Sequence, residues 1–442
     1  MGQNKGHSNI KNKNFFNEFI STEAFSGFLL FAATLIAVII ANSPLGDWYH
    51  SLWQQPLGLN FGEYNASMSL HMWINDGLMA LFFLMVGLEI KRELLIGELS
   101  SFQKASFPVI AAIGGMVIPA LIYVALNPDN PMGFGVPMAT DIAFALGILL
   151  LLGNKVSPIL KLFLVSLAVV DDLGAVLVVA VVYTQELHLE YLIHFIVVYG
   201  LIWALNLKGI KNLTPYLFFG IFLWIYIHAI GIHATIAGVL LALAIPLRFD
   251  AKATIREKLF VIRTKKAIDE FDRHIDEKPV LNAQQIESLE EIAYRQDKIQ
   301  SPLMKLEYRL HNLSAYLIMP LFAFANAGVV IDFAGVNEHF SIVFGVMLGL
   351  VIGKPIGIIG LTWLVSKTGI TKKPHEINWM EVVAVGFLAG IGFTMSIFIT
   401  QLAFLDDATI SAVKLGIFAA SFTAGIIGVI LINIAHKRKI NG

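Results

Sequence analysis

The chain has 442 residues and a mean hydropathy of +0.72; 57% of its residues are hydrophobic and only 14% are charged. Soluble domains carry about 25% charged residues, so this much apolar surface cannot be hidden in one water-soluble core and requires lipid as its solvent. The net charge of −1 gives no reason to expect a nucleic-acid partner, and the absence of cysteine excludes disulfides and cysteine metal sites. The polar segment 1–23 lacks the apolar core and cleavage site of a signal peptide, so we expect it in the mature protein.

Apolar windows of about 20 residues predict an all-α polytopic membrane protein with about twelve transmembrane helices. In chain order they lie near residues 24–42, 70–90, 106–126, 133–153, 159–183, 190–207, 214–230, 232–247, 307–330, 340–365, 378–404 and 409–435. Eight spans therefore fall within 24–247 and four within 307–435, and a short tail, 436–442, follows them. The charged insertion 248–306 has apolar residues at helical spacing, which favours two amphipathic helices over a dedicated regulatory domain.

Lysine and arginine are confined to alternate loops. They crowd the N-terminus and the segments 91–104, 155–161, 208–211, 248–309, 367–373 and 437–439, whereas the intervening loops carry almost none. The positive-inside rule then places the basic loops and both termini in the cytoplasm, which requires an even number of spans. One outer loop, Leu57–Tyr64, alternates around Asn60 and Gly62 and is expected to form a small hairpin.

Ionisable side chains deep inside an apolar span are costly and are therefore functional candidates. Asp171 and Asp172 lie about 11 residues, or roughly 16 Å, from either end of their span. Adjacent helical residues point about 100° apart, so one carboxylate can line a cavity while the other pairs with another helix. Lys354 cannot reach the surface and needs a buried partner, most simply an aspartate. The structural alternatives are a neutral, hydrogen-bonded aspartate pair and a lysine at the end of a shorter helix.

Two spans contain helix-breaking residues at corresponding places in the two halves of the chain: Pro137 in the fourth, and Gly386, Gly390 and Gly392 in the eleventh. Such interruptions are the best sequence pointer to the binding site of a transporter, and half-helix ends carry partial charges of about half a unit. Asp141, which follows Thr140, and Lys354 suit those ends. We expect two broken helices that cross at mid-membrane, with spans three to five related to spans ten to twelve as an inverted repeat.

The buried ionisable groups, three aspartates and one lysine, have a net formal charge of −2 and attract cations. The oxygens of Asp171, Asp172 and Thr140 suit hard ions such as Na⁺ or Li⁺. A bare buried carboxylate has to be neutralised by a metal ion or a proton, so mutually exclusive occupancy produces exchange of the two.

Further ionisable residues lie nearer the ends of the spans: Glu89, Arg92, Glu93 and Glu307 towards the cytoplasm, and Asp76 and His233 towards the outside. Periodicity alone favours ordinary helix-end charge for the cytoplasmic group. A lone histidine is more often structural than functional, and Asp76 stays open between the two interpretations.

Together these segments resemble the NhaA family of sodium/proton antiporters. The similar stretches are WINDGLMALFFLMVGLEIKREL, ATDIAFALG, LAVVDDLGAVLV, GIHATIAGV, FAFANAG, GKPIGI and GFTMSIFI. The similarity runs from about residue 20 to 435, interrupted by 248–306. The family is itself an established example of inverted repeats, so the repeat expectation is not independent of the resemblance.

The resemblance implies an electrogenic, pH-regulated Na⁺(Li⁺)/H⁺ antiporter of the bacterial inner membrane that exchanges cytoplasmic sodium for external protons. It would be a secondary active transporter, not an enzyme, would need no cofactor, and would serve pH homeostasis and salt tolerance. Asp172 would be the central cation and proton carrier, Asp171 would pair with Lys354, and Thr140 and Asp141 would sit at the helix crossing. Glu89, Arg92, Glu93, Glu307 and His233 would belong to the pH response. The hairpin 57–64 would form a homodimer contact within membrane lipid.

Three other classes of membrane protein fit these residues less well. A sodium-coupled solute symporter should show a larger polar pocket. An intramembrane aspartyl protease needs its two aspartates on different, facing helices, and a channel does not need a buried lysine.

Overall fold

The computed structural model describes residues 15–61, 64–184, 187–247, 301–369, 371 and 373–441. Most of the predicted insertion lies outside these residues, and its two amphipathic helices stay a prediction. The described chain consists of helices and one two-stranded antiparallel sheet.

The first half contains the following elements: α1 (Phe15–Ala41), α2 (Gly46–Gln54), β1 (Pro56–Phe61), β2 (Tyr64–Ser69), α3 (Leu70–Met72), η1 (Trp73–Leu78), α4 (Met79–Leu95), η2 (Glu98–Ser100), α5 (Phe102–Leu126), η3 (Pro131–Met138), α6 (Ile142–Leu151), η4 (Gly153–Lys155), α7 (Pro158–Val182), η5 (Leu189–Tyr191), α8 (Leu192–Leu207), α9 (Leu213–Ile230) and α10 (Ile236–Ala244). The second half contains α13 (Pro302–Leu313), η6 (Ser314–Ile318), α14 (Met319–Asn326), α15 (Phe333–Glu338), α16 (Phe340–Leu348), η7 (Gly349–Gly353), α17 (Lys354–Lys367), α18 (Trp379–Ala389), α19 (Phe393–Ala403) and α20 (Asp407–Asn441).

Every predicted span coincides with a helical stretch in the described residues. Within the described part of the chain, eight helices are long and apolar enough to cross a membrane, or up to ten if two bent pairs each form one span. The pair Trp379–Ala389 and Phe393–Ala403 is bent by 47°, at the predicted glycine break. Two predicted spans do not meet this criterion of length and hydropathy. The eighth corresponds to α10, which has only nine residues. The ninth corresponds to Pro302–Asn326, whose first turns carry Glu307 and Arg309. The all-α, multi-pass membrane fold is confirmed.

The helix ends follow from local sequence. Ser157 caps α7 by accepting a hydrogen bond from Leu160 N at 3.2 Å, directly before a proline at the first helical position. Asn378 and Glu381 form a reciprocal capping box at the start of α18. Gly231 ends α9 in the left-handed conformation with φ of 94°, which only glycine adopts without strain, so the division between the seventh and eighth spans falls there.

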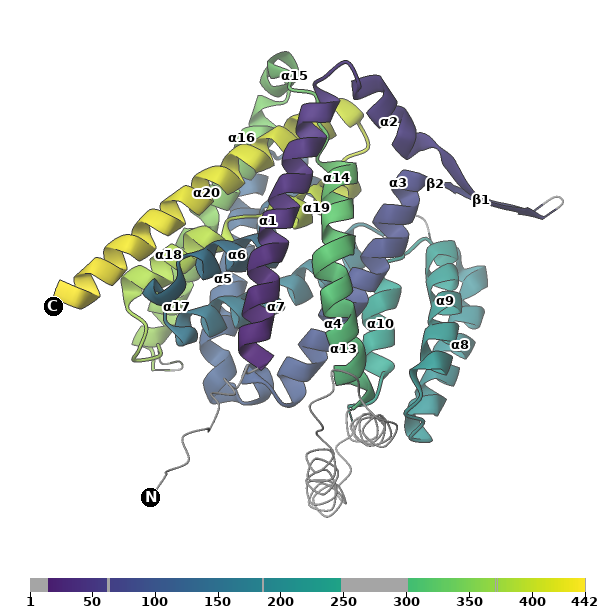
Figure 1. Ribbon diagram of the computed structural model, residues 1–442, viewed down its shortest axis with the longest axis horizontal. Helices are drawn as coiled ribbons and strands as arrows, with labels where there is room; N and C mark the ends of the chain where they lie inside the picture. The colour runs from purple at the N-terminus through teal and green to yellow at the C-terminus, as the bar shows by residue number, and fades with distance from the viewer. Residues whose placement is uncertain are drawn as a thin grey trace, which may run out of the picture.

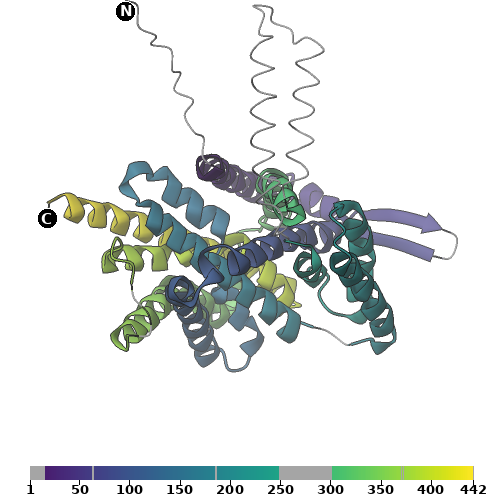
Figure 2. The ribbon, with the colours of Figure 1, turned by 90° about the horizontal axis from the view of Figure 1, so that it is seen from below.

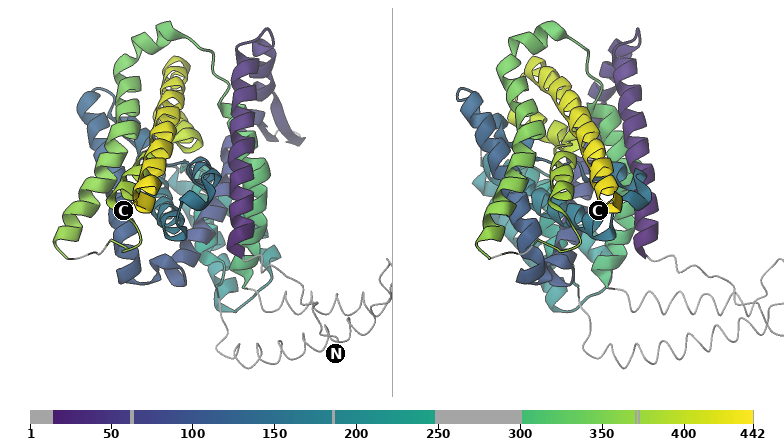
Figure 3. Two further views of the ribbon diagram at one scale, coloured as in Figure 1. Left: turned by 60° about the vertical axis from the view of Figure 1, so that its left-hand side comes forward. Right: turned by 90° about the vertical axis from the view of Figure 1, so that its left-hand side faces the viewer.

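The helices lie side by side as one bundle, with α8 and α9 at one edge and α20 at the opposite edge (Figure 1). Helix α5 packs against both α17 and α7. Its approach to α17 is so close that a Cβ atom on Gly114 would lie 2.1 Å from the carbonyl oxygen of Gly357. In Figure 3, α1 runs alongside α13 and α14, and α1 packs against α14 and α6. This packing holds Lys354, at the start of α17, against the middle of the bundle.

The hairpin is longer than predicted. Strands β1 and β2 pair from Pro56 opposite Ser69 to Phe61 opposite Tyr64, and they project sideways from the bundle (Figures 1 and 2). We call the end of the bundle that carries them the hairpin end, and the end near Glu307 the Glu307 end. Helices α2 and α15, which lie in segments predicted to be loops between spans, are also at the hairpin end.

Buried apolar side chains form two clusters that meet at α7. One includes Val169 and Ala175 and spreads over α4, α10 and α14, and the other includes Leu164 and Leu167 and spreads over α5, α6 and α18. Asp171 and Asp172 lie at the junction, and both side chains are buried.

Candidate functional site

Both predicted helix breaks are present, and they touch each other. Helix η3 ends at Met138 and α6 starts at Ile142, while α18 ends at Ala389 and α19 starts at Phe393. The backbone between the half-helices cannot form helical hydrogen bonds, which is tolerated at membrane depth only where protein or cavity surrounds it. Here Asp141 N donates to the carbonyl of Ile391 at 2.7 Å, and Thr140 Oγ1 donates to the carbonyl of Ala389 at 2.9 Å.

Asp141 compensates the N-terminal ends of both broken helices. Its Oδ1 accepts from Phe144 N at 3.1 Å, and its Oδ2 accepts from Thr394 N at 3.0 Å and from the Thr394 hydroxyl. The side chain is completely buried. A carboxylate satisfies the free amides at a helix start and interacts favourably with its partial positive charge, and this one does so for α6 and α19 at once.

Lys354 compensates the opposite kind of helix end. Its side chain is fully buried, and Nζ donates to Asp171 Oδ2 at 2.8 Å and to the carbonyl of Met138, the last residue of η3. The cation thus faces both a carboxylate and the negative end of a half-helix. The single hydroxyl hydrogen of Thr140 is shared between the Ala389 carbonyl and Asp171 Oδ2, which lies 2.5 Å from Oγ1. Asp171 Oδ1 is buried without a hydrogen-bond partner among the described residues.

Asp172 is in a different situation from its neighbour. Its side chain is only 2% exposed, and within the described chain no hydrogen bond or ion pair engages its carboxylate. It lines a cavity of about 50 Å³ together with Thr140, Asp141 and Glu89. Such a cavity has room for several water molecules, at about 10–15 Å³ each by this measure. One of the adjacent aspartates is therefore paired across the bundle, and the other faces open space.

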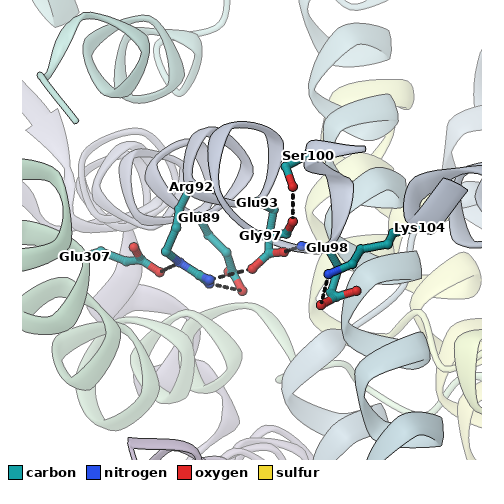
Figure 4. Close-up of polar contacts among 8 residues, drawn as sticks. All are labelled: Glu89, Arg92, Glu93, Gly97, Glu98, Ser100, Lys104 and Glu307. Atoms are coloured by element: carbon teal, nitrogen blue, oxygen red, sulfur yellow. Dashed lines mark hydrogen bonds and ion pairs between the residues drawn. The ribbon is translucent and has the colours of Figure 1, made fainter. Parts of the chain in front are cut away.

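The charges predicted towards the cytoplasm form one network at the Glu307 end (Figure 4). Arg92 donates from Nε to Glu307 Oε1 at 2.8 Å and from Nη1 to Glu93 Oε1 at 2.5 Å, and its Nη2 lies 3.9 Å from Glu89 Oε1. Glu307 reaches this network because α13 packs against α4. Since Glu89 also lines the cavity, it links the network to the space that Asp172 faces.

The structure does not bring His233 to that network. His233 Nε2 lies 3.6 Å from Asp76 Oδ1, and Nδ1 lies 2.8 Å from the hydroxyl of Thr235. Asp76 is thirteen residues from Glu89 along one helical stretch, or about 20 Å at 1.5 Å per residue. Asp76 and His233 therefore form a separate pair near the hairpin end.

The sequence did not reveal a polar cluster near the same end, formed by the amides of Asn75, Asn326 and Gln401 with the imidazole of His71. Asn75 Nδ2 donates to Gln401 Oε1 at 2.8 Å, Asn326 Nδ2 donates to Asn75 Oδ1 at 2.9 Å, and Asn326 Oδ1 lies 2.9 Å from His71 Nε2. The available signal was the presence of polar residues inside three different spans. A single neutral amide costs little free energy in a span, so none of these residues alone indicated a site.

The possible cation ligands are oxygens. Among the residues that the structure describes, no group of three or more histidine, cysteine or acidic side chains could hold a metal ion. The two aspartates and Thr140 are the oxygen donors gathered at the crossing. Carboxylate and hydroxyl oxygens are hard ligands, which suit hard cations such as Na⁺ and Li⁺.

A polytopic membrane protein whose interrupted helices cross at buried, charge-compensated ends belongs to the transporters built on discontinuous helices. Residues 17–432 match the model of the family described as Na+/H+ antiporter 1. The chain is 59% identical over 432 residues to Na(+)/H(+) antiporter NhaA 1 of Aliarcobacter butzleri (strain RM4018), covering 98% of this chain and 99% of that protein. It is 50% identical over 428 residues to Na(+)/H(+) antiporter NhaA of Wolinella succinogenes, with 95% and 93% covered. It is 47% identical over 424 residues to the Helicobacter pylori (strain G27) protein of that name, with 95% of each covered. The chain belongs to the NhaA family of Na⁺/H⁺ antiporters.

Proposed function

We propose that this protein is an electrogenic Na⁺(Li⁺)/H⁺ antiporter, a secondary active transporter that exchanges cytoplasmic sodium for external protons and is regulated by pH. The observation that carries the proposal is the difference between two adjacent aspartates. Asp171 is paired with Lys354, whereas Asp172 is buried on a cavity with no protein partner among the described residues.

Exchange follows from the electrostatics of Asp172. A buried, unpartnered carboxylate is too costly to remain charged and bare, so it holds either a proton or a cation. Oδ1 of Asp171 and the hydroxyl of Thr140 are the further oxygens that can join a cation there. Because a proton and a cation compete for the same carboxylate, loading one releases the other.

Electrogenic exchange needs a second proton, and Lys354 is the group that can supply it. A cation that approaches Asp171 competes with the ammonium group 2.8 Å from Oδ2. Deprotonation of Lys354 would end that competition and release a second proton for each cation bound. Binding of the cation would then displace more than one proton.

The basic loops support an orientation with both termini in the cytoplasm of a bacterial cell and the protein in the inner membrane. The network of Glu89, Arg92, Glu93 and Glu307 then lies on the cytoplasmic side and adjoins the cavity through Glu89, where it would set the pH response. The hairpin, which leaves the bundle sideways, would hold two copies together in membrane lipid. No cofactor is needed, since the cargo ions do the work of neutralising Asp172.

The size of the cavity at Asp172 argues against the alternative, a sodium-coupled solute symporter. The cavity at Asp172 is about 50 Å³, whereas organic ligands occupy pockets of roughly 300–1,000 Å³.

Everted membrane vesicles that hold a pH gradient test the proposal. Addition of Na⁺ or Li⁺ should dissipate the gradient with this protein present, and not with Asp172→Asn, whose amide can neither take up a proton nor supply a charge. If neither ion has an effect at any pH from neutral to alkaline, the proposal is wrong. Sodium uptake that requires an added organic solute would favour the symporter instead.

A further inference from the structure

A buried hydroxyl on α1 has no partner. Ser26 is fully buried, and its Oγ makes no hydrogen bond within the described structure. Leaving a buried polar atom without a hydrogen bond costs about 1–3 kcal/mol. A buried hydroxyl of this kind therefore indicates a partner such as a water molecule or an ion.

The surroundings of Ser26 specify which occupant it serves. Ser26 lines the cavity that also contains Asp172 and Glu89, and Ser314 lines the same cavity. Most of the remaining wall is apolar, contributed by side chains such as Phe82, Met85, Val86, Val165, Met319 and Met395. An ion that moves between the two carboxylates therefore meets few neutral oxygens, and the serine hydroxyls are two of them.

The backbone around both serines is shaped for this position. Beside Ser26, Gly27 lets α1 approach α6 so closely that a Cβ there would lie 3.2 Å from the carbonyl of Ala143. Ser314 begins η6, a π-helical turn in which the regular helical hydrogen bonding between α13 and α14 is interrupted. Such π turns inside α-helices occur frequently at functional sites.

We propose that Ser26 and Ser314 form a neutral oxygen waypoint that holds the partly hydrated Na⁺ or Li⁺ ion between Glu89 and Asp172. The inference rests on the antiport activity proposed above. Hydroxyl oxygens are hard ligands suited to these ions. Because they carry no charge, they replace part of the hydration shell without trapping the ion, and fast passage requires such weak intermediate binding. Water in the remaining cavity supplies the other ligands.

The test compares Ser26→Ala, Ser314→Ala and the double variant with wild type in proteoliposomes, by the apparent KM for Na⁺ and for Li⁺ and by the maximal rate. We expect the double variant to raise the apparent KM for both ions by about tenfold, which corresponds to about 1.4 kcal/mol. The midpoint of the pH profile should stay unchanged, and Ser26→Thr, which keeps the hydroxyl, should retain the wild-type KM.

Thr34→Val is the matched control. Thr34 lies on the same helix, is also buried, and donates its hydroxyl to the carbonyl of Leu30 at 3.0 Å; it does not line the cavity. Its replacement removes a buried hydroxyl and should leave the apparent KM unchanged. An effect equal to that of Ser26→Ala would mean that any buried hydroxyl on α1 matters, and would overturn the waypoint.

A second measurement, of thiol accessibility, tests the proposal if the alanine variants insert poorly into the membrane. The chain has no cysteine, so Ser26→Cys introduces a single thiol, and its rate of modification by a small positively charged thiosulfonate reports access to the site. Na⁺ should slow this reaction, while the same concentration of choline should not. Wild-type exchange with an unchanged KM in the double variant, or no Na⁺ protection of the thiol, refutes the waypoint. Failure of the wild type itself to exchange refutes the antiport proposal instead.

Discussion

The ion pair between Lys354 and Asp171 leads us to predict how two substitutions change the thermal stability of the protein, independently of transport. The two side chains are 0% and 1% exposed, and Nζ lies 2.8 Å from Oδ2. At that separation the attraction is about 6 kcal/mol for an effective dielectric constant of about 20. Desolvation of both ions opposes it, so the pair has a small net effect, whereas removing one partner alone costs about 3–5 kcal/mol.

We therefore expect Lys354→Gln and Asp171→Asn each to lower the melting temperature of the purified protein in detergent. The first leaves the Asp171 carboxylate without its ammonium partner, and the second leaves the Lys354 ammonium group facing only neutral oxygens, the Met138 carbonyl and the new amide. The double variant replaces both charges with neutral amides and should be closer to wild type than either single variant. The double-mutant cycle measures this coupling directly.

Lys367→Gln is the matched control, because Lys367 lies at the exposed end of the same helix. Its Nζ sits 3.7 Å from the centroid of the Trp363 ring, an exposed contact worth about 0.5–1 kcal/mol. It should change the melting temperature little and show no coupling to Asp171→Asn. If Lys354→Gln and Asp171→Asn destabilise additively, the two charges do not stabilise each other and the assignment of Lys354 to Asp171 is wrong.

Four shorter predictions concern Asp172, the voltage dependence of exchange, the cluster at Asn326 and the hairpin. Asp172→Asn should abolish exchange without lowering the melting temperature, because the carboxylate has no protein partner to lose; Asp332→Asn, at an exposed helix cap, should keep full exchange. Transport should accelerate when valinomycin and potassium dissipate the opposing voltage, since one net charge moved through 100 mV is worth about 2.3 kcal/mol, and equal rates with and without the shunt would indicate one-for-one exchange. Asn326→Leu should destabilise by about 1–3 kcal/mol, because it leaves the amides of Asn75 and Gln401 partly unsatisfied. Asn433→Leu should cost less, because it loses one bond within its own helix and one exposed bond from Lys155. Replacing residues 57–64 with a short turn should yield monomers that still exchange, and dimers that persist would place the contact elsewhere.

The spans, the two breaks and the partner of Lys354 were all predictable, because the membrane restricts the possibilities. Lipid admits only helices whose apolar stretches match its thickness, so hydropathy predicts where they begin and end. Proline and glycine in spans four and eleven marked the breaks. A lone buried lysine has few places to put its charge, and the structure places it against Asp171.

Contacts between spans could not be predicted in the same way. Viewed on its own helix, Arg92 looks like an ordinary charge at a helix end, and only the packing of α13 on α4 brings Glu307 to within 2.8 Å of it. Ser26 looks like any small residue in an apolar helix, and its lack of a partner becomes visible only when the cavity around it is known. The resemblance linked His233 to the pH response, but its neighbour in space is Asp76.

The charge balance at the crossing supports the proposal that Asp172, of the three buried aspartates, is the one that binds the transported ion. Asp141 faces two half-helix N-termini, whose partial charges of about half a unit each offset its own. Asp171 is offset by Lys354. The C-terminal ends of η3 and α18 receive hydrogen bonds from Lys354 and Thr140, but their partial negative charges, about one unit together, remain. Asp172 and these two carbonyl ends are thus the negative charge that no fixed positive group offsets. A sodium ion or a proton on Asp172 offsets only part of this negative charge, so the site still favours positive charge. In the proposed exchange, Lys354 gives up its proton when the cation bound at Asp172 also engages Asp171.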